Sequence, residues 1–160
     1  MARNETVGKI VLPNAAFSGK DYVYFTEYNY FDLAVDENGL WVIYAAEAEP
    51  HSLLVSKLDL VTLRAEKTWN ISVTHQNFGN GFIVCGVLYL VQDATQPSTV
   101  ISYAYDLYTK EVIVLPGPIK FLNPFQMNIM IAYNPRDKKI YSWDNGNQLI
   151  YPILASQGGR

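Results

Sequence analysis

The stretch DLAVDENGLWVIY (32–44) holds two short apolar runs separated by the turn formers Asp-Glu-Asn-Gly (36–39). Asp and Asn side chains bond their own backbone in turns, so the stretch predicts a β-hairpin. The same arrangement of strand, tight turn and strand with an early aromatic residue returns twice. The two later copies are NGFIVCGVLYLV (80–91) and MIAYNPRDKKIYSW (130–143). The sequence therefore predicts three repeated hairpins.

Further strands are expected at matching places after each hairpin. The predicted third strands are LLVSKLD (53–59), TVISYAYD (99–106) and QLIYPIL (148–154), and the predicted fourth strands are RAEKTWNISV (64–73) and KEVIVLPGP (110–118). The opening segment GKIVLPN (8–14) resembles the second of these fourth strands. A repeat of four antiparallel strands about every 40 to 50 residues is typical of β-propeller blades. We expect the opening segment to supply the missing outer strand of the last blade.

The predicted fold class is all-β, because no segment shows an apolar stripe of helical period with a cap and a stop. The chain holds about three blades, whereas propellers have four to eight. We therefore expect a part of a larger propeller or of an assembly, with the propeller domain at 7–154 and flexible ends at 1–6 and 155–160. The alternative is a sandwich or barrel of eleven or twelve strands.

Charge and hydropathy exclude two classes of partner. The chain has 160 residues with 12 basic and 15 acidic side chains, a net charge of −3. Binding to nucleic acid needs clustered Lys and Arg, so we do not expect it. The longest apolar run, GFIVCGVLYLV (81–91), is too short to cross a bilayer as a helix, so we expect no membrane insertion.

A single cysteine, Cys85, and two glycosylation sequons bear on localisation. A buried thiol inside a strand is one interpretation of Cys85. The sequons at Asn4 and Asn70 favour a secreted chain, in which an odd cysteine would pair with a partner outside this chain. The sequence alone leaves both interpretations open.

Four segments resemble, in order and spacing, the signature segments of olfactomedin domains. They are DLAVDENGLWVIY (32–44), TLRAEKTW (62–69), NGFIVCGVLY (80–89) and AYNPRDKKIYSWDNG (132–146). The resemblance extends from Val7 to Tyr151. It implies the C-terminal three blades of a secreted five-bladed propeller that makes protein–protein contacts in adhesion and signalling, without enzymatic activity. It also implies a disulfide between Cys85 and a cysteine of the N-terminal part of the domain.

The resemblance further implies Ca²⁺, with Na⁺ nearby, in the central channel. The implied ligands are the Asp32 carboxylate, the Asn80 amide and the backbone carbonyls of Gly81 and Ile131, with Leu33 serving Na⁺. Alignment of the repeats places Asp32, Asn80 and Ala132 at equivalent positions on the innermost strands. The second carboxylate of the family falls at Ala132, and an earlier aspartate falls at Tyr30. Because Ca²⁺ takes six to eight oxygen ligands, we favour a metal-free channel in which Asp32 and Asn80 are hydrogen-bonded.

Two aromatic segments are candidate interaction loops. They are 22–30, with Tyr24 and Tyr28, and 120–130, with Phe121 and Phe125. Aromatic residues are enriched at interfaces, although these segments could instead pack over one end of the channel. The expected partners are extracellular or cell-surface proteins, missing propeller blades or another copy of the chain.

Two alternative functions remain open at this stage. A glycan-binding or glycan-active five-bladed propeller would need several inward carboxylates, and only Asp32 occupies such a place in the aligned repeats. The other alternative is a structural oligomer of propeller fragments.

Overall fold

The structure is a computed structural model that describes residues 6, 8–48 and 52–153. Within these ranges the regular secondary structure is β-strand, apart from one turn of 3-10 helix, η1 (His75–Asn77). No helix in the described residues is long and apolar enough to cross a membrane. The all-β prediction is confirmed.

The strands form three antiparallel sheets. The first sheet contains β1 (Phe31–Asp36), β2 (Gly39–Ala45), β3 (Ser52–Asp59) and β4 (Arg64–Thr74). The second contains β5 (Asn80–Val84), β6 (Val87–Val91), β7 (Ser98–Asp106), β8 (Glu111–Val112) and β9 (Ile119–Leu122). The third contains β10 (Asn128–Asn134), β11 (Lys139–Asp144) and β12 (Asn147–Pro152). Each sheet runs in chain order, as propeller blades do.

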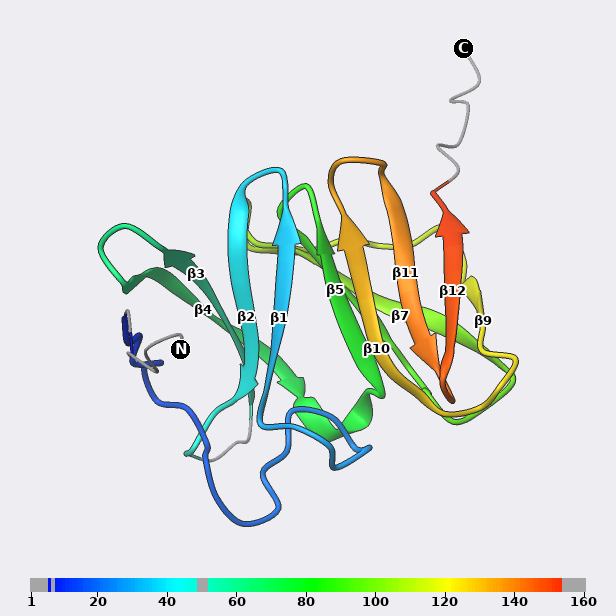
Figure 1. Ribbon diagram of the computed structural model, residues 1–160, viewed down its shortest axis with the longest axis horizontal. Helices are drawn as coiled ribbons and strands as arrows, with labels where there is room; N and C mark the ends of the chain where they lie inside the picture. Colours follow the sequence, from blue (N-terminus) through cyan, green and yellow to red (C-terminus); the bar gives the residue numbers. More distant parts are fainter. Residues whose placement is uncertain (1–5, 7, 49–51, 154–160) are drawn as a thin grey trace, which may run out of the picture.

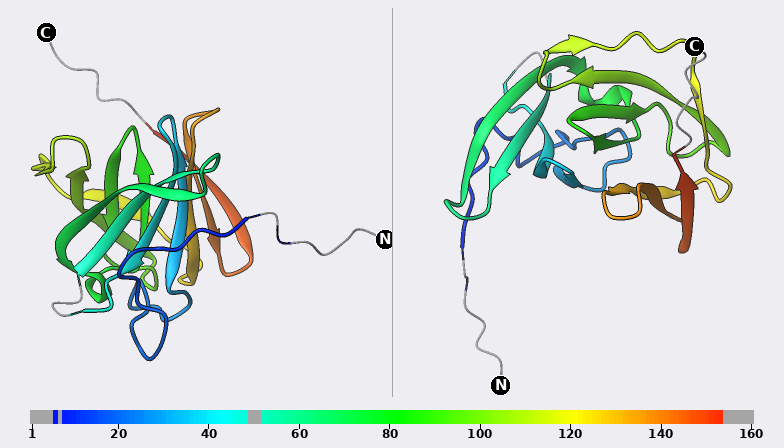
Figure 2. Two further views of the ribbon diagram at one scale, coloured as in Figure 1. Left: turned by 90° about the vertical axis from the view of Figure 1, so that its left-hand side faces the viewer. Right: turned by 90° about the horizontal axis from the view of Figure 1, so that it is seen from above.

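The innermost strands β1, β5 and β10 contact one another (Figure 1). From above, the three sheets fan outwards from these strands and leave one side open (Figure 2). The arrangement matches part of a β-propeller, as predicted, and the alternative of a single sandwich or closed barrel is not observed.

Two cores hold the three sheets together. Between the first and second sheets, Trp41, Ile43 and Leu53 pack with Ile83 and Leu88, all fully buried. Between the second and third sheets the buried cluster is formed by Phe82, Val91, Ile101, Phe121, Ile131 and Ile140. Burial of these apolar side chains is the main force that fixes the sheets face to face.

The prediction that segment 8–14 is a strand that completes the last blade is wrong. This segment lies along the first sheet, where Ile10 and Leu12 pack against Val42 and Tyr44. The Tyr44 hydroxyl donates a hydrogen bond to the Pro13 carbonyl at 3.0 Å. The apolar face of the first sheet therefore holds the segment on the side of the molecule away from β12 (Figure 1).

The predicted fourth strand at 110–118 is also corrected. Only β8 pairs with β7 there, and β9 pairs with the other half of β7, so two short strands share the fourth position. Pro116 and Pro118 lie between them, and proline has no N–H for the ladder. The predicted flexible ends, and the sequon residue Asn4, lie outside the described residues apart from residue 6.

Candidate functional site

The three inner strands bring together the residues predicted to face the axis. Asp32 lies on β1, Asn80 and Gly81 on β5, and Ile131 and Ala132 on β10, and these strands touch. The inner strands are neighbours, as the repeats predicted, but by register Ala132 lies two positions nearer its hairpin turn than Asp32 and Asn80 do. The surroundings of each side chain decide what the site can bind.

Tyr24 occupies this axial site together with Asp32. Its hydroxyl donates a hydrogen bond to Asp32 Oδ2 at 3.0 Å. Burial raises the pKa of the Asp32 carboxyl to about 6, although the hydrogen bond from Tyr24 lowers it. A Cβ atom on Gly81 would come within 2.9 Å of the Tyr24 hydroxyl, so a larger residue at this position would displace that hydroxyl.

The prediction that Tyr24 is an interaction-loop residue is therefore wrong. The Tyr24 side chain is buried. Burial is the main cause that raises the pKa of its hydroxyl well above 10, and the negative charge of Asp32 is the second cause. The sequence offers no signal that separates Tyr24 from the neighbouring tyrosines, because the loop that carries it has no regular period.

The described residues do not fit a Ca²⁺ site of the implied kind. Asp32 is already hydrogen-bonded, and the buried Asn80 Oδ1 accepts a hydrogen bond from the Gly81 N–H at 2.9 Å. Ala132 carries no oxygen in its side chain, and Ca²⁺ prefers sites with several carboxylate oxygens. The described part of the chain holds no group of three or more His, Cys, Asp or Glu residues able to share a metal ion.

Tyr30 stands where the resemblance implies an earlier aspartate, and it contacts the segment that contains Gly19 and Tyr22. Its ring stacks on Tyr22 with centroids 4.8 Å apart, and its hydroxyl donates to the Gly19 carbonyl at 3.0 Å. Tyr30 therefore braces the loop.

A second cluster links the hairpin turns at the upper end of the inner strands. Glu37, in the β1–β2 turn, accepts a hydrogen bond from the Tyr133 hydroxyl of β10 at 2.5 Å. Its other oxygen accepts from the backbone N–H of Cys85 at 3.3 Å and from its thiol at 3.4 Å. The hydrogen bond from Tyr133 lowers the pKa of Glu37, which favours the carboxylate form. Through its two oxygens this carboxylate joins the first sheet to the second and the third. No sequence motif indicated this cluster.

Cys85 lies in the β5–β6 turn and is exposed, so the interpretation of a buried strand thiol is wrong. Partial desolvation raises the pKa of its thiol, and Glu37 adds to the effect. The thiol is therefore accessible and protonated at neutral pH.

The neighbouring Asp36 is buried and fixes the same turn to the second sheet. Its Oδ1 accepts from Trp41 Nε1 at 2.7 Å, and its Oδ2 accepts from the Gly86 N–H at 2.6 Å. The turn-forming role predicted for Asp36 thus extends across two sheets.

The second aromatic segment divides into a buried and an exposed part. Phe121 lies in β9, is only 4% exposed and packs on Tyr151 with ring centroids 4.6 Å apart, so its prediction as an interface residue is wrong. Phe125 is 42% exposed on the following loop. The buried Asp144 accepts hydrogen bonds from the backbone N–H groups of Phe125 and Met127, both at 2.8 Å. The Asp144 carboxylate therefore braces this loop.

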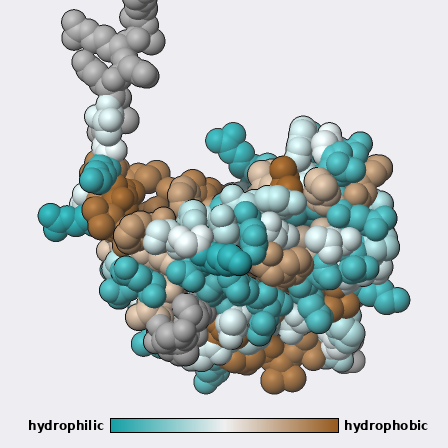
Figure 3. All heavy atoms as spheres, turned by 90° about the horizontal axis from the view of Figure 1, so that it is seen from below, coloured by the Kyte–Doolittle hydropathy of each residue, from teal (hydrophilic) through white to brown (hydrophobic). Residues whose placement is uncertain are grey.

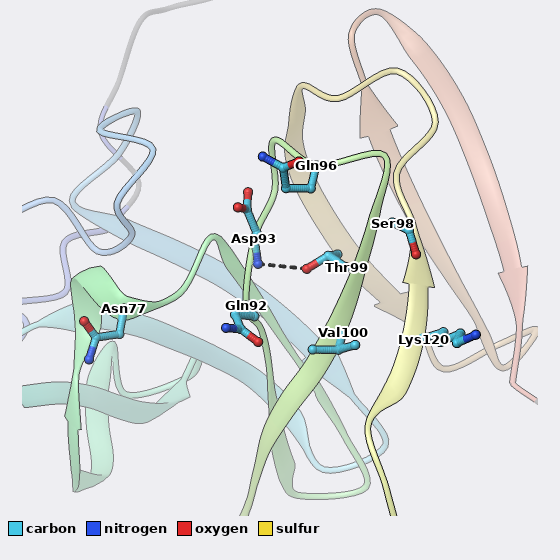
Figure 4. A pocket seen from close by; sticks show the side chains of 8 residues that line it. All are labelled: Asn77, Gln92, Asp93, Gln96, Ser98, Thr99, Val100 and Lys120. Atoms are coloured by element: carbon cyan, nitrogen blue, oxygen red, sulfur yellow. Dashed lines mark hydrogen bonds between the residues drawn. The ribbon is translucent and has the colours of Figure 1, made fainter.

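A polar depression along the second sheet has a volume of about 500 Å³ (Figure 4). It is lined by Asn77, Gln92, Asp93, Gln96, Ser98, Thr99, Val100 and Lys120. The side chains of Asn77 and Lys120 lie at opposite sides of it and do not converge (Figure 4). Asp93 is the one carboxylate among these lining residues, and its Oδ1 accepts a hydrogen bond from the Thr95 N–H. The depression therefore offers no pair of carboxylates for acid–base catalysis.

Comparison with known proteins agrees with this geometry. The sequence model described as the olfactomedin-like domain matches residues 1–157. Myocilin from Bos taurus is 39% identical over 146 residues, which cover 91% of this chain and 29% of that protein. Myocilins from Canis lupus familiaris and Homo sapiens are each 38% identical over the same length. The chain therefore spans less than a third of the curated relatives that it matches.

Proposed function

The chain belongs to the olfactomedin-like domain family, and on this premise we propose that it is an extracellular protein-interaction module without enzymatic activity. The observation that supports this most is an exposed aromatic residue on a rigid loop. Phe125 stands on a loop that the buried Asp144 braces through two backbone hydrogen bonds. A loop that is already ordered loses little entropy on binding.

The second candidate loop carries Tyr28, which is exposed next to the stacked pair Tyr22 and Tyr30. Both loops lie at the lower end of the sheets (Figure 1). From below, hydrophobic patches alternate with hydrophilic surface (Figure 3). Such a mixed surface with aromatic residues is typical of protein–protein interfaces.

The glycan-active alternative has little support from the geometry. Glycosidases place two carboxylates on either side of the scissile bond. On β1, Asp32 is hydrogen-bonded to Tyr24, and the other aspartate, Asp36, is occupied by Trp41 and Gly86. Neither carboxylate is free to meet a substrate.

Binding tests this function directly. The purified chain, presented as a multivalent probe, is screened against a panel of extracellular protein domains. For any domain that binds, Phe125→Ser or Tyr28→Ser should weaken binding at least tenfold, because each removes an exposed aromatic anchor. Val61→Ser is the matched control, since Val61 is 93% exposed at the β3–β4 turn. Equal effects of all three changes would contradict the loop assignment, and glycan cleavage by the chain would contradict the function.

Two modifications belong to the proposed extracellular setting. We propose that Cys85 forms a disulfide with a cysteine outside this chain and that Asn70 is glycosylated. The exposed position of Cys85 and the exposed position of Asn70 on β4 support them.

We further propose that the channel binds no Ca²⁺, because Ala132 supplies no second carboxylate beside Asp32. Millimolar Ca²⁺ should leave the melting temperature of the chain unchanged. Ala132→Asp should create a dependence on Ca²⁺, with the folded state stabilised by about 2.7 kcal/mol when Ca²⁺ is at 100 times its dissociation constant. A Ca²⁺-dependent rise in the melting temperature of the unmodified chain would overturn this proposal.

A further inference from the structure

The fourth strand of the second sheet is split into β8 and β9, and the register gives the size of the break. On one side of it, Ile119 of β9 pairs with Ile101 of β7. On the other side, the Ile113 N–H donates a hydrogen bond to the Ala104 carbonyl at 2.9 Å. The five residues 114–118 therefore stand opposite only two residues of β7, so the connection holds three residues more than a continuous strand would.

The break contains the segment Pro116–Gly117–Pro118, which we call the proline segment. Proline has no N–H to donate to a strand ladder. A Cβ atom on Gly117 would meet nothing within 4 Å, so this part of the segment stands in open space. At the same level β7 is irregular on its other side, because its register with β6 shifts between Leu90 and Val91. Such a bulge bends the strand.

The proline segment is not required to turn the chain. Both β8 and β9 are antiparallel to β7, so the chain runs in the same direction before and after the segment. A reversal of the chain therefore does not account for the three extra residues.

The strands on either side of the break form an apolar edge. In the described part of the chain, β8 and β9 pair with β7 alone, so their outer backbone groups face away from the sheet. Val112, Val114, Ile119 and Leu122 are between 42% and 89% exposed. An unpaired edge with β-branched and other apolar side chains is a template on which another strand can pair.

Without the proline segment, the two strands would join into one. Residues 111–115 followed by 119–122 read EVIVLIKFL, which is nine residues, seven of them apolar. Their partner β7 is also nine residues long. The joined strand would match β7 along its whole length while both observed registers are kept. A segment with high β propensity, low charge and no proline is the kind that associates with copies of itself.

We propose that the proline segment prevents the outer edge of the second sheet from pairing with the same edge of another copy of this chain. Short edge strands, prolines and bulges each protect a sheet edge, and all three coincide at this point. The proposal goes beyond the proposed function, because it concerns residues 98–122 and does not involve the interaction loops.

Deletion of residues 116–118 tests the proposal. Light scattering measures the molar mass of the deletion variant and of the unmodified chain side by side over a range of concentrations. A reducing agent is present so that Cys85 cannot link two copies. The deletion variant should associate at a concentration at least about tenfold lower, because each joined edge adds backbone hydrogen bonds between copies. Hydrogen exchange should slow in peptides that cover residues 111–122 when this variant associates.

A charged side chain on the joined edge provides the matched control. Val114→Lys in the deletion variant should restore the association behaviour of the unmodified chain, because two paired edges would bring like charges together. Val114→Lys alone should change nothing, since this side chain is 89% exposed in the unmodified chain. The double substitution Pro116→Thr and Pro118→Thr keeps the three extra residues but restores their N–H groups, and it should promote association less than the deletion does.

Circular dichroism checks that each variant has folded. A folded deletion variant that associates no more than the unmodified chain would overturn the proposal. So would association without slower exchange at residues 111–122, or association that persists after Val114→Lys. If the deletion variant does not fold, an unchanged mass in the double threonine variant overturns the proposal instead. Binding of a partner through Phe125 does not use this edge, so the proposed function and this proposal can fail separately.

Discussion

The first and third sheets begin from the same kind of hairpin and end with different burial. In the first sheet, β2 is buried from Trp41 to Ala45, because the second sheet covers one side and the segment around Ile10 and Leu12 covers the other. In the third sheet, β12 contains no fully buried residue, because this sheet packs on one neighbouring sheet and has three strands in the described part of the chain. The burial of a strand therefore depends on the sheets and segments that pack on its blade, and the sequence of the hairpin alone does not determine this burial.

A cleft beside β12 shows the same difference. It has a volume of about 440 Å³, lies between the second and third sheets, and includes Phe82, Phe121 and Tyr151 in its lining. The outer strand of a complete blade would lie along this edge. In the described part of the chain, the third sheet is thus open at its outer edge.

The largest expected effect compares the same substitution in the two sheets. Ile43→Ala on β2 empties a fully buried site and should cost about 3 to 4 kcal/mol of unfolding free energy. Ile150→Ala on β12 alters a half-exposed side chain and should cost less than about 1 kcal/mol. Urea unfolding of the two variants and of the unmodified chain measures both costs. Equal costs would show that the third sheet is as well covered as the first.

The two buried aspartates provide the next comparison. Asp36→Ala would leave Trp41 Nε1 and the Gly86 N–H without their acceptor and should cost about 3 kcal/mol. Asp144→Ala would free the loop at Phe125 and should cost about 2 kcal/mol, with faster hydrogen exchange confined to that loop. If the Asp144→Ala variant unfolds globally at the same urea concentration as the Asp36→Ala variant, the distinction between the two aspartates is wrong.

The hairpins and the inner strands were predictable because their signals are local. Turn formers at 36–39 and 144–147 fix where strands end, and the repeat of those hairpins places Asp32 and Asn80 on neighbouring inner strands. The burial of Phe121 was not predictable in this way. It depends on Tyr151, which is thirty residues away along the chain.

The candidate site was predictable only in part for the same reason. Asp32 follows from the repeat, but Tyr24 comes from an irregular loop, and nothing in its local sequence directs it to the axis. The contact of Glu37 with Tyr133 joins residues 96 positions apart. Such pairs form only when the whole fold brings them together, so one sequence without relatives does not reveal them.

The pH dependence of stability should distinguish the inner strand of the first sheet from that of the third. The folded-state pKa of Asp32, about 6, lies above the ordinary value of 3.8, so the folded chain holds this proton more tightly than the unfolded chain. The stability from Asp32 is fully present below pH 3.8 and is lost as the pH rises through 6, by about 2 to 3 kcal/mol.

Asp32→Asn should flatten this part of the pH profile, because an amide does not titrate yet still accepts a hydrogen bond from Tyr24. The inner strand of the third sheet, β10 (Asn128–Asn134), carries no carboxylate. Unfolding midpoints between pH 4 and 7 measure the effect, and an unchanged slope in the Asp32→Asn variant would assign it to another group.

The smallest effect compares two turn glycines with almost the same backbone. Gly86, in the second sheet beside the first, has φ +78°, and Gly146, in the third sheet, has φ +80°. A Cβ at residue 86 would lie 2.4 Å from Tyr108 Cε2, whereas a Cβ at residue 146 would meet nothing within 4 Å. Gly146→Ala should therefore cost about 1 kcal/mol for backbone strain alone, and Gly86→Ala about 1 kcal/mol more.

The extra cost at Gly86 has an identifiable source in the contact between the first two sheets. The Tyr108 ring packs edge-on against Trp41 of the first sheet, with centroids 6.3 Å apart, so it cannot yield to a new Cβ without disturbing that contact. In a Tyr108→Ala background, Gly86→Ala should therefore cost no more than Gly146→Ala does. A double-mutant cycle of Gly86 and Tyr108, measured by urea unfolding, gives this coupling directly. If the coupling is zero, the two turns differ for a reason other than the packing of one sheet against the next.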